Sequence, residues 1–204
     1  MPNTRGHWDN TYASKPENGV SWYQANPSVS LRLIHSAAPD HSSPIVDIGG
    51  GASRLTDCLL SDGFTDLTVL DISEVALSRA QARLKEAAQR VTWIVSDITQ
   101  WQPPRSFAVW HDRAVFHFLT APDQQDAYIR ALMRGTKSGS AVIIATFSLC
   151  GPERCSGLPV KRYSADSLSA RLGADFELYE QVEESHKTPF GTAQDFIYAA
   201  FRRR

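Results

Sequence analysis

Ile45-Val-Asp-Ile-Gly-Gly-Gly-Ala-Ser53 runs from four mostly apolar residues directly into three glycines. The apolar residues predict a short buried strand, because a brief apolar run bounded by turn residues is typical of one. Gly49, Gly50 and Gly51 permit positive φ angles and leave no Cβ between the backbone and a ligand. The segment 53–62 predicts a helix whose first N–H groups face the turn and bind a negative or polar group. This order of strand, turn and helix predicts a nucleotide-type site in an open α/β sheet.

The residues around the glycine turn separate two kinds of nucleotide site. A dinucleotide fingerprint requires Gly-x-Gly-x-x-Gly, and its third glycine position is Arg54 in this chain. Asp47 stands two residues before Gly49, which makes the motif Asp-x-Gly-x-Gly. A second acid, Asp71, ends the next expected strand, where an acid typically accepts hydrogen bonds from ribose hydroxyls.

The rest of the chain alternates strand patterns with helix patterns and ends in a hairpin pattern. Strands that alternate with helices predict an α/β fold built on a parallel sheet. The length of 204 residues fits one domain, which we expect to cover residues 1–204. The expected strands are residues 45–48, 67–70 with an end at Asp71, 91–95, about 107–111 with an end at Asp112-Arg113, 141–147, 176–183 and 196–201.

The bulk properties of the chain exclude several classes of function. A net charge of −1 and a pI of about 6.6 argue against nucleic acid as a partner. No apolar run approaches the ~20 residues of a membrane span, and no signal peptide is visible, so no membrane partner is expected. Three cysteines, an odd number, argue against a disulfide framework and for a reducing compartment. We therefore expect a cytoplasmic protein.

Residues 1–40 precede the expected core, which spans residues 45–204. Asn26-Pro27 predicts an N-cap and first residue for a helix over residues 28–38. The segment before it is too rich in large aromatic residues for a disordered arm, and it serves either as a lid on the site or as a simple anchor through burial of its rings. These aromatic residues are Trp8, Tyr12, Trp22 and Tyr23.

These motifs resemble those of the class I S-adenosylmethionine-dependent methyltransferases. Asp47 with Gly49 and Gly51 matches the first motif of the family, and Asp71 matches the acid that holds the ribose. The order of five alternating strands and a final hairpin extends the resemblance over nearly the whole chain. The resemblance implies a Rossmann-like α/β fold, with a seven-stranded, mostly parallel sheet, an antiparallel last strand and helices on both faces. It also implies S-adenosylmethionine as the cofactor.

Two further motifs of the family have counterparts later in the chain. Asp97 with Ile98 matches the acid and apolar pair that flanks the adenine, and Asp112 falls in the motif that lines the methyl-transfer site. An aromatic residue of the N-terminal segment, Trp22 or Tyr23, could close over the cofactor. The residues that we expect to bind it are Trp22, Asp47, Gly49, Gly50, Gly51, Asp71, Ile72, Asp97, Ile98 and Asp112.

Several local stretches resemble a narrower group, the small protein-lysine methyltransferases related to the mitochondrial citrate synthase lysine methyltransferase and their bacterial relatives. The resemblance implies a protein lysine as the methyl acceptor. The chain departs from the mitochondrial member in showing no presequence. It also lacks the Asn-Pro-Pro-Tyr type of motif that amine and amide nucleic-acid methylases carry, and reads Asp112-Arg113-Ala114-Val115 at that position. The stretches are Trp8 with Tyr12, 21–24, 111–114, 117–119, 155–160 with 162–163, and 188–191 before Gln194.

A lysine acceptor must lose a proton before it attacks, because its free pKa is about 10.4. A desolvating aromatic slot or a nearby base would lower that barrier. Asp112, His117 and Tyr163 are the catalytic candidates, and the first two are expected at the end of the fourth strand. Two of these residues also have a purely structural interpretation. His117 is then a residue at the start of a helix that is hydrogen-bonded to the backbone, and Tyr163 is an aromatic residue that only packs.

Other acceptors and other classes of protein compete with this reading. Cys150 and Cys155, in the long connection 148–163, could bind a thiophilic acceptor such as an arsenic species, or they are incidental thiols. A small amine or carboxylate is a further acceptor, and no metal site is expected, because no second cysteine pair exists. Outside the class stand a non-catalytic nucleotide-binding module and a nicotinamide-dependent oxidoreductase. Arg54 and the absence of a Tyr-x-x-x-Lys pair speak against the oxidoreductase.

Overall fold

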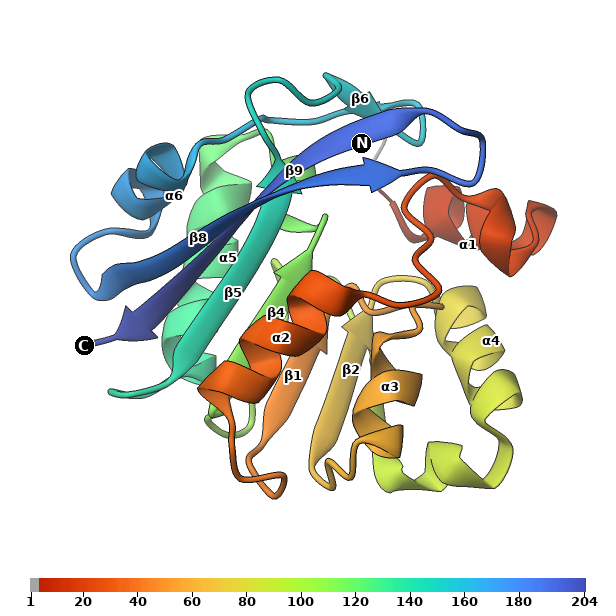
Figure 1. Cartoon of the computed structure of the whole chain (residues 1–204), viewed down its shortest axis with the longest axis horizontal. Helices are drawn as coiled ribbons and strands as arrows, with labels where there is room; N and C mark the ends of the chain where they lie inside the picture. Colours follow the sequence, from red (N-terminus) through yellow and green to blue (C-terminus); the bar gives the residue numbers. More distant parts are fainter. Residues whose placement is uncertain (1–3) are drawn as a thin grey trace.

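A seven-stranded sheet forms the centre of the computed structural model, which describes residues 4–204 (Figure 1). Two short strands form a separate small sheet within the long connection that follows the fifth strand. The strands are β1 (Ile45–Ile48), β2 (Leu67–Asp71), β3 (Val91–Val95), β4 (Val109–Arg113), β5 (Ala141–Phe147), β6 (Arg154–Cys155), β7 (Leu158–Pro159), β8 (Phe176–Lys187) and β9 (Ala193–Arg203).

The strand order in the large sheet is β3-β2-β1-β4-β5-β9-β8. The first five strands of the chain pair in parallel, whereas β9 is antiparallel to both β5 and β8. The predicted sheet, mostly parallel with an antiparallel last strand, is confirmed. Because the five parallel strands point the same way, the residues at their carboxyl ends meet at one edge of the sheet.

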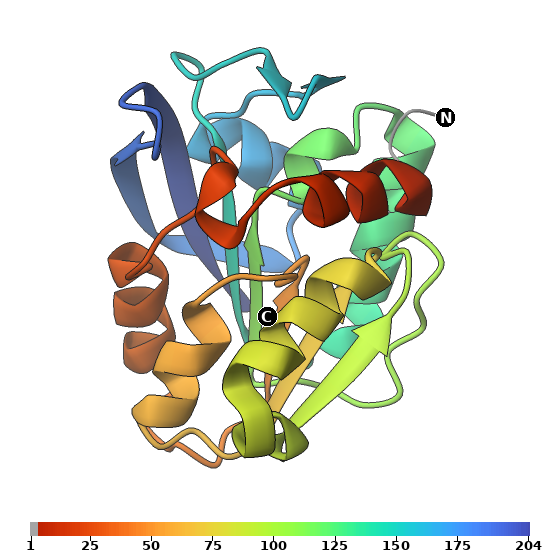
Figure 2. The same ribbon diagram turned by 90° about the vertical axis from the view of Figure 1, so that its right-hand side faces the viewer.

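Helices cover both faces of this sheet, as predicted (Figures 1 and 2). α2, α3 and α4 pack on one face, and α5 and α6 pack on the other. The helices are α1 (Arg5–Ser14), α2 (Ser28–Ala37), α3 (Leu55–Ser61), α4 (Glu74–Leu84), α5 (Pro122–Gly135) and α6 (Ala165–Leu172), with short 3₁₀ turns η1 (Glu17–Gly19), η2 (Lys85–Arg90) and η3 (Phe116–Phe118). None of the helices within residues 4–204 combines the length and apolar character that a bilayer crossing requires.

One helix cap and several element boundaries differ from the sequence prediction. α2 begins at Ser28 as expected, but Asn26 does not cap it, since Pro27 is the residue before the helix and no side chain caps its first turn. α3 begins at Leu55, not residue 53, because the Ser53 hydroxyl accepts the Leu55 N–H at 3.1 Å and prolongs the turn. β4 begins at Val109, two residues later than expected, and ends at Arg113, as expected.

The alternation of side chains along β4 decides which of them reach the site. Side chains of a strand alternate between the two faces of a sheet. Val109 belongs to the core under α2 and α3, and Trp110 to the core under α5. The side chains of His111 and Arg113 therefore lie on the same side of the sheet as that of Val109, and the side chain of Asp112 lies on the same side as that of Trp110.

The N-terminal segment lies over the carboxyl edge of the sheet, where α1 runs beside α4 (Figure 2). The Ser73 hydroxyl, at the start of α4, donates to the Asp9 carboxylate at 2.6 Å. Arg79 of α4 donates to the Lys15 carbonyl just past the end of α1. These bonds tie the segment to the core; its first three residues lie outside the described part of the chain.

Candidate active site

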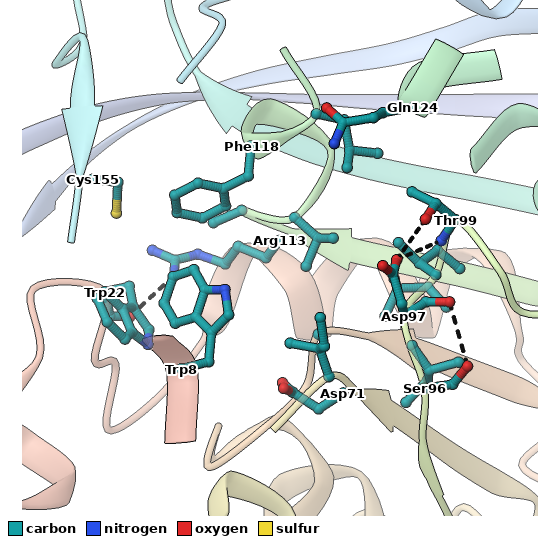
Figure 3. Close-up of a pocket in the computed structure, with 18 of the residues that line it drawn as sticks. Trp8, Trp22, Asp71, Ser96, Asp97, Thr99, Arg113, Phe118, Gln124 and Cys155 are labelled. Carbon is teal, nitrogen blue, oxygen red and sulfur yellow. Dashed lines mark hydrogen bonds between the residues drawn. The ribbon is translucent and has the colours of Figure 1, made fainter. Parts of the chain in front are cut away.

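A cavity of about 830 Å³ opens at the carboxyl edge of β1, β2 and β4, beneath α1 (Figure 3). Acids and hydroxyls line one end of the cavity, and aromatic rings with one arginine line the other. The residues that form it are Trp8, Tyr12, Trp22, Ile48, Gly49, Leu70, Asp71, Ile72, Ser96, Asp97, Ile98, Thr99, Arg113, Ala114, Val115, Phe118, Leu119, Gln124 and Cys155.

The glycine turn after β1 forms part of the cavity floor and is shaped for close approach. Gly49 has φ +68°, and a Cβ there would overlap a methyl group of Val115. A Cβ on Gly50 would lie 2.5 Å from Asp47 Oδ2. Glycine is therefore required both by the backbone angle and by the space that the turn leaves.

Asp47 is held by a buried histidine that sequence reasoning did not assign. His111 Nδ1 lies 2.7 Å from Asp47 Oδ1, and its Nε2 lies 2.9 Å from the Ser30 hydroxyl. The other oxygen, Oδ2, is buried and has no hydrogen-bond partner within residues 4–204. All three side chains line a second cavity of about 590 Å³, which shares Gly49 and Arg113 with the first. An unpaired buried carboxylate oxygen beside a glycine turn fits a cationic or N–H donor of a ligand.

Asp71 and Asp97 both line the large cavity. Asp71 Oδ1 accepts the Ser73 N–H at 2.7 Å, and burial raises the pKa of this carboxyl to about 7. Asp97 Oδ1 accepts the backbone N–H and the hydroxyl of Thr99, both at 2.8 Å. Ile72 and Ile98 lie beside them in the cavity wall. The two acids are thus oriented by the turns that follow β2 and β3.

The structure does not bring Asp112 to this cavity. Its side chain is fully buried on the α5 side of the sheet, where it accepts the Val115 and Phe116 N–H groups and the Tyr128 hydroxyl. Burial raises the pKa of Asp112 to about 7. Asp112 stands at the end of the fourth strand, as the sequence predicted, but its side chain lies on the α5 side of the sheet and caps the following turn instead of lining the methyl-transfer site.

His117 and Tyr163, the other two catalytic candidates, are likewise buried and do not line the large cavity. His117 Nδ1 accepts the Phe147 N–H at 3.3 Å, which is the structural alternative considered from the sequence. Burial, with the nearby Arg113 charge, lowers its pKa to about 3, so it is neutral at physiological pH. Tyr163 packs against Phe116, and burial raises its pKa to about 12.

Trp22 lines the cavity as expected, and the aromatic wall around it was not assigned from the sequence. Trp8 packs edge-on against both Trp22 and Phe118, at ring-centroid distances of 5.8 and 5.1 Å. Tyr12 packs against Trp22 at 6.1 Å. The richness of the N-terminal segment in aromatic residues pointed to such a wall, but Phe118 of η3 was not among the expected site residues, although the stretch 117–119 was part of the narrower resemblance.

Arg113 is the cation of the cavity and was also missed. Its Nε donates to the Tyr198 hydroxyl at 2.9 Å, and its Nη1 donates to the Trp22 carbonyl at 3.0 Å. The guanidinium carbon lies 4.4 Å from the centre of the Phe196 ring. The expected end of the fourth strand at Asp112-Arg113 contained the signal, because side-chain alternation puts His111 and Arg113 on one face.

Comparison with known proteins supports the class that the fold suggests. Residues 45–139 match the family model described as a methyltransferase domain. The N-methyltransferase NodS from Bradyrhizobium japonicum, solved in complex with S-adenosyl-L-homocysteine, is 17% identical and has a TM-score of 0.72, with 96% of this chain and 97% of that chain covered. Residues 45–139 thus match a methyltransferase domain, and the chain has the Rossmann-like α/β fold of the solved structure that it resembles.

Two curated relatives differ in the acceptor that their names state. The "eEF1A lysine and N-terminal methyltransferase homolog" of Drosophila melanogaster is 22% identical over 70% of this chain and 23% of its own length. The "malonyl-[acyl-carrier protein] O-methyltransferase" of Anoxybacillus flavithermus is 30% identical over 61% of this chain and 48% of its own length. The matched part of this chain therefore spans less than half of either relative.

Proposed function

We propose that this chain transfers a methyl group from S-adenosylmethionine to a nucleophile that enters the large cavity. The observation that carries the proposal is that Gly49, Asp71 and Asp97, which follow three different strands, line one cavity. A glycine turn and two acids at the carboxyl edge of a parallel sheet form the usual kind of nucleotide-binding crevice. The orphan oxygen of Asp47 beside the turn supports the same reading.

Each polar group has a role that follows from its chemistry. Asp47 Oδ2 would accept from the ammonium group of the methionine part, and the glycine turn would let that part lie close. Asp71 would accept from the ribose hydroxyls, since a buried carboxylate is a strong acceptor. Asp97 would accept from the adenine amine, with Ile72 and Ile98 against the ring. Trp22 would cover the cofactor from the N-terminal segment.

The reaction needs positioning and exclusion of water more than it needs acid or base groups. S-adenosylmethionine supplies, when bound, a methyl group on a sulfonium: the acceptor forms a bond to the methyl carbon, the C–S bond breaks with its electron pair going to sulfur, and the acceptor loses a proton. Trp8, Tyr12 and Trp22 would keep water out, because their rings roof the cavity. We infer no catalytic base among the buried candidates Asp112, His117 and Tyr163.

A small-molecule acceptor is the class that this cavity fits best. A protein lysine, as the narrower resemblance and the name of the Drosophila relative suggest, remains the second candidate. The lysine would have to be deprotonated, and its ammonium form would have to approach the Arg113 guanidinium. A neutral or anionic acceptor does not bring an ammonium group close to Arg113, so it needs no such deprotonation and meets no such repulsion.

Calorimetric titration of the purified protein with S-adenosyl-L-homocysteine tests the cofactor. We expect saturable binding at one site per chain, and no binding of NADH in a parallel titration. Binding of NADH alone would overturn the proposal in favour of the nicotinamide-dependent class. Failure of both ligands to bind would favour a domain that has lost its nucleotide site.

Incubation with host lysate and a cofactor that carries a radiolabelled methyl group tests the acceptor. We expect the label in the small-molecule fraction. Label on a protein band, located by mass spectrometry on a lysine, would establish the second candidate instead. A variant with Asp71→Ala serves as the control for transfer by other enzymes in the lysate.

A further inference from the structure

The Arg113 guanidinium is fixed on three sides and has one donor group left over. Its Nη2 is buried and has no hydrogen-bond partner among the described residues. Glu184 Oε2 forms an ion pair with this group at 3.9 Å, a distance that is too long for a hydrogen bond. Both oxygens of Glu184 already accept hydrogen bonds, from the Gln24 amide at 2.9 Å and from the Tyr198 hydroxyl at 3.0 Å. A buried N–H without a hydrogen-bond partner destabilises the folded protein, so a ligand oxygen that accepted a hydrogen bond from this group would bind favourably.

The position of Arg113 in the cavity indicates which kind of ligand would bind to its guanidinium. Figure 3 shows its guanidinium beside Trp22 and Cys155, at the opposite end of the cavity from Asp97 and Thr99. The acidic end has the groups expected to hold an adenosine, and the arginine end has aromatic walls. The cavity therefore has ends of opposite charge.

We propose that Arg113 binds a carboxylate of the methyl acceptor, and that the acceptor is a small molecule in which this carboxylate adjoins an apolar or aromatic body. The inference rests on the proposed function and specifies its substrate class. A planar guanidinium matches a carboxylate with parallel N–H···O bonds, and the pair is stronger where water is excluded. Trp8, Trp22 and Phe118 supply the apolar contact surface.

The contacts that fix Arg113 make it suited to this role. The Tyr198 hydroxyl and the Trp22 carbonyl hold Nε and Nη1, so the guanidinium plane is set before a ligand arrives. A preorganised group loses less entropy on binding, which raises affinity. The contact with the Trp22 carbonyl also joins the arginine to the segment that roofs the cavity. The same fixed charge repels an ammonium group, which disfavours a lysine at this end.

The other carboxylate that could reach Arg113 is that of the cofactor's methionine part, because Arg113 also lines the second cavity with Asp47. The two sources are separable by binding measurements. If Arg113 serves the acceptor, replacing it leaves affinity for S-adenosyl-L-homocysteine nearly unchanged. If Arg113 binds the cofactor instead, replacing it lowers the affinity for S-adenosyl-L-homocysteine, and acceptor binding is weakened as a consequence.

The test uses matched pairs of acids and amides on protein saturated with S-adenosyl-L-homocysteine. Benzoate, phenylacetate and indole-3-acetate, each with its neutral amide, are titrated by calorimetry. We expect at least one carboxylate to bind about tenfold or more tightly than its amide, and this preference to disappear in Arg113→Gln. Affinity of the variant for S-adenosyl-L-homocysteine should stay within about threefold of wild type. Arg130→Gln, which removes an exposed arginine of α5, is the matched control and should keep the preference.

Three outcomes would overturn the inference. Equal binding of acids and amides by the wild-type protein, or no binding of any pair, removes the proposed anion site. Retention of the preference in Arg113→Gln assigns it to another group. Loss of S-adenosyl-L-homocysteine binding in the variant assigns Arg113 to the cofactor. By contrast, wild-type protein that fails to bind S-adenosyl-L-homocysteine at all refutes the proposed function itself.

A folding defect would not leave the inference untested. The comparison of acids with amides in the wild-type protein needs no variant. Arg113→Lys keeps the charge but loses the planar fork, and we expect it to retain part of the preference. Thermal unfolding of each variant, measured beside the titrations, identifies any that have lost their fold.

Discussion

The two ends of the large cavity differ in how far apart their residues lie in the chain. At the acidic end, Asp71 is the last residue of β2 and Asp97 lies two residues after β3, and each is oriented by a hydrogen bond from a residue two positions later. At the aromatic end, Trp8, Arg113 and Cys155 come from three separate parts of the chain. The acidic end is a set of local turns brought to one sheet edge, whereas the aromatic end exists only through tertiary contacts. The first kind of site can be predicted from a sequence, and the second cannot.

The largest effect that we expect from this comparison is loss of cofactor binding in Asp71→Ala. Removing a charged acceptor of two ribose hydroxyls costs about 3 kcal/mol, which corresponds to roughly a hundredfold loss in affinity. Calorimetry with S-adenosyl-L-homocysteine measures it. Glu86→Gln, at an exposed position, is the control and should bind as wild type does. Near-normal affinity of Asp71→Ala for S-adenosyl-L-homocysteine would contradict the proposal that the acidic end binds the cofactor.

A smaller loss is expected in His111→Ala, which tests whether the long-range contacts of Asp47 matter. The variant removes the 2.7 Å partner of Asp47 and leaves a second carboxylate oxygen buried without a hydrogen bond. We expect affinity for S-adenosyl-L-homocysteine to fall about tenfold and the free energy of unfolding to fall by about 2–4 kcal/mol. Urea unfolding and calorimetry measure the two. Affinity that is unaffected would mean that the histidine only packs.

The pH dependence of cofactor affinity sharpens the role of Asp71. With a pKa of about 7 in the ligand-free protein, about a tenth of this carboxyl is ionised at pH 6 and about nine tenths at pH 8. Since the ionised form is the better acceptor, affinity for S-adenosyl-L-homocysteine should rise about ninefold over this range. Titrations at several pH values measure the rise, and in Asp71→Asn the profile should be flat. A flat profile in the wild-type protein would contradict the assignment.

The raised pKa of Asp71 also affects the stability of the folded protein. Stability falls as the pH rises, whereas affinity for S-adenosyl-L-homocysteine rises. The folded protein disfavours the ionised form of Asp71, whose pKa in the unfolded chain is about 3.9. The protonated carboxyl therefore contributes stability at low pH, and this contribution is lost as the pH rises from about 4 through 7. Asp112, with a pKa raised to about 7 by burial, acts in the same sense.

The smallest effect on cofactor binding is expected in His117→Ala. The side chain lies outside the cavity and accepts one backbone hydrogen bond from Phe147. We expect S-adenosyl-L-homocysteine affinity within about threefold of wild type, and a loss of about 2–3 kcal/mol in the free energy of unfolding, because a buried ring leaves a void. A fall in turnover without a fall in stability would restore His117 as a catalytic candidate.

The fold was predictable because its signals are local. Short apolar runs, a glycine turn and the spacing of helices identify an α/β sheet without knowledge of any long-range contact. The glycine turn and the two acids after β2 and β3 were predictable for the same reason. Asp112 was misassigned because its place at the end of a strand does not say on which side of the sheet its side chain lies, and the alternation along β4 puts it on the α5 side.

What the sequence by itself determined is the parallel sheet and the acids at its carboxyl edge, because alternating strand and helix patterns predict parallel strands and the acids stand at or near the ends of the strand patterns. Only the tertiary structure decided that Trp8, Phe118 and Arg113 share a cavity and that Asp112 does not. The physical reason is that such groupings depend on how elements far apart in the chain pack together and on which side of a strand each side chain points. Neither is set by the residues nearby in the sequence.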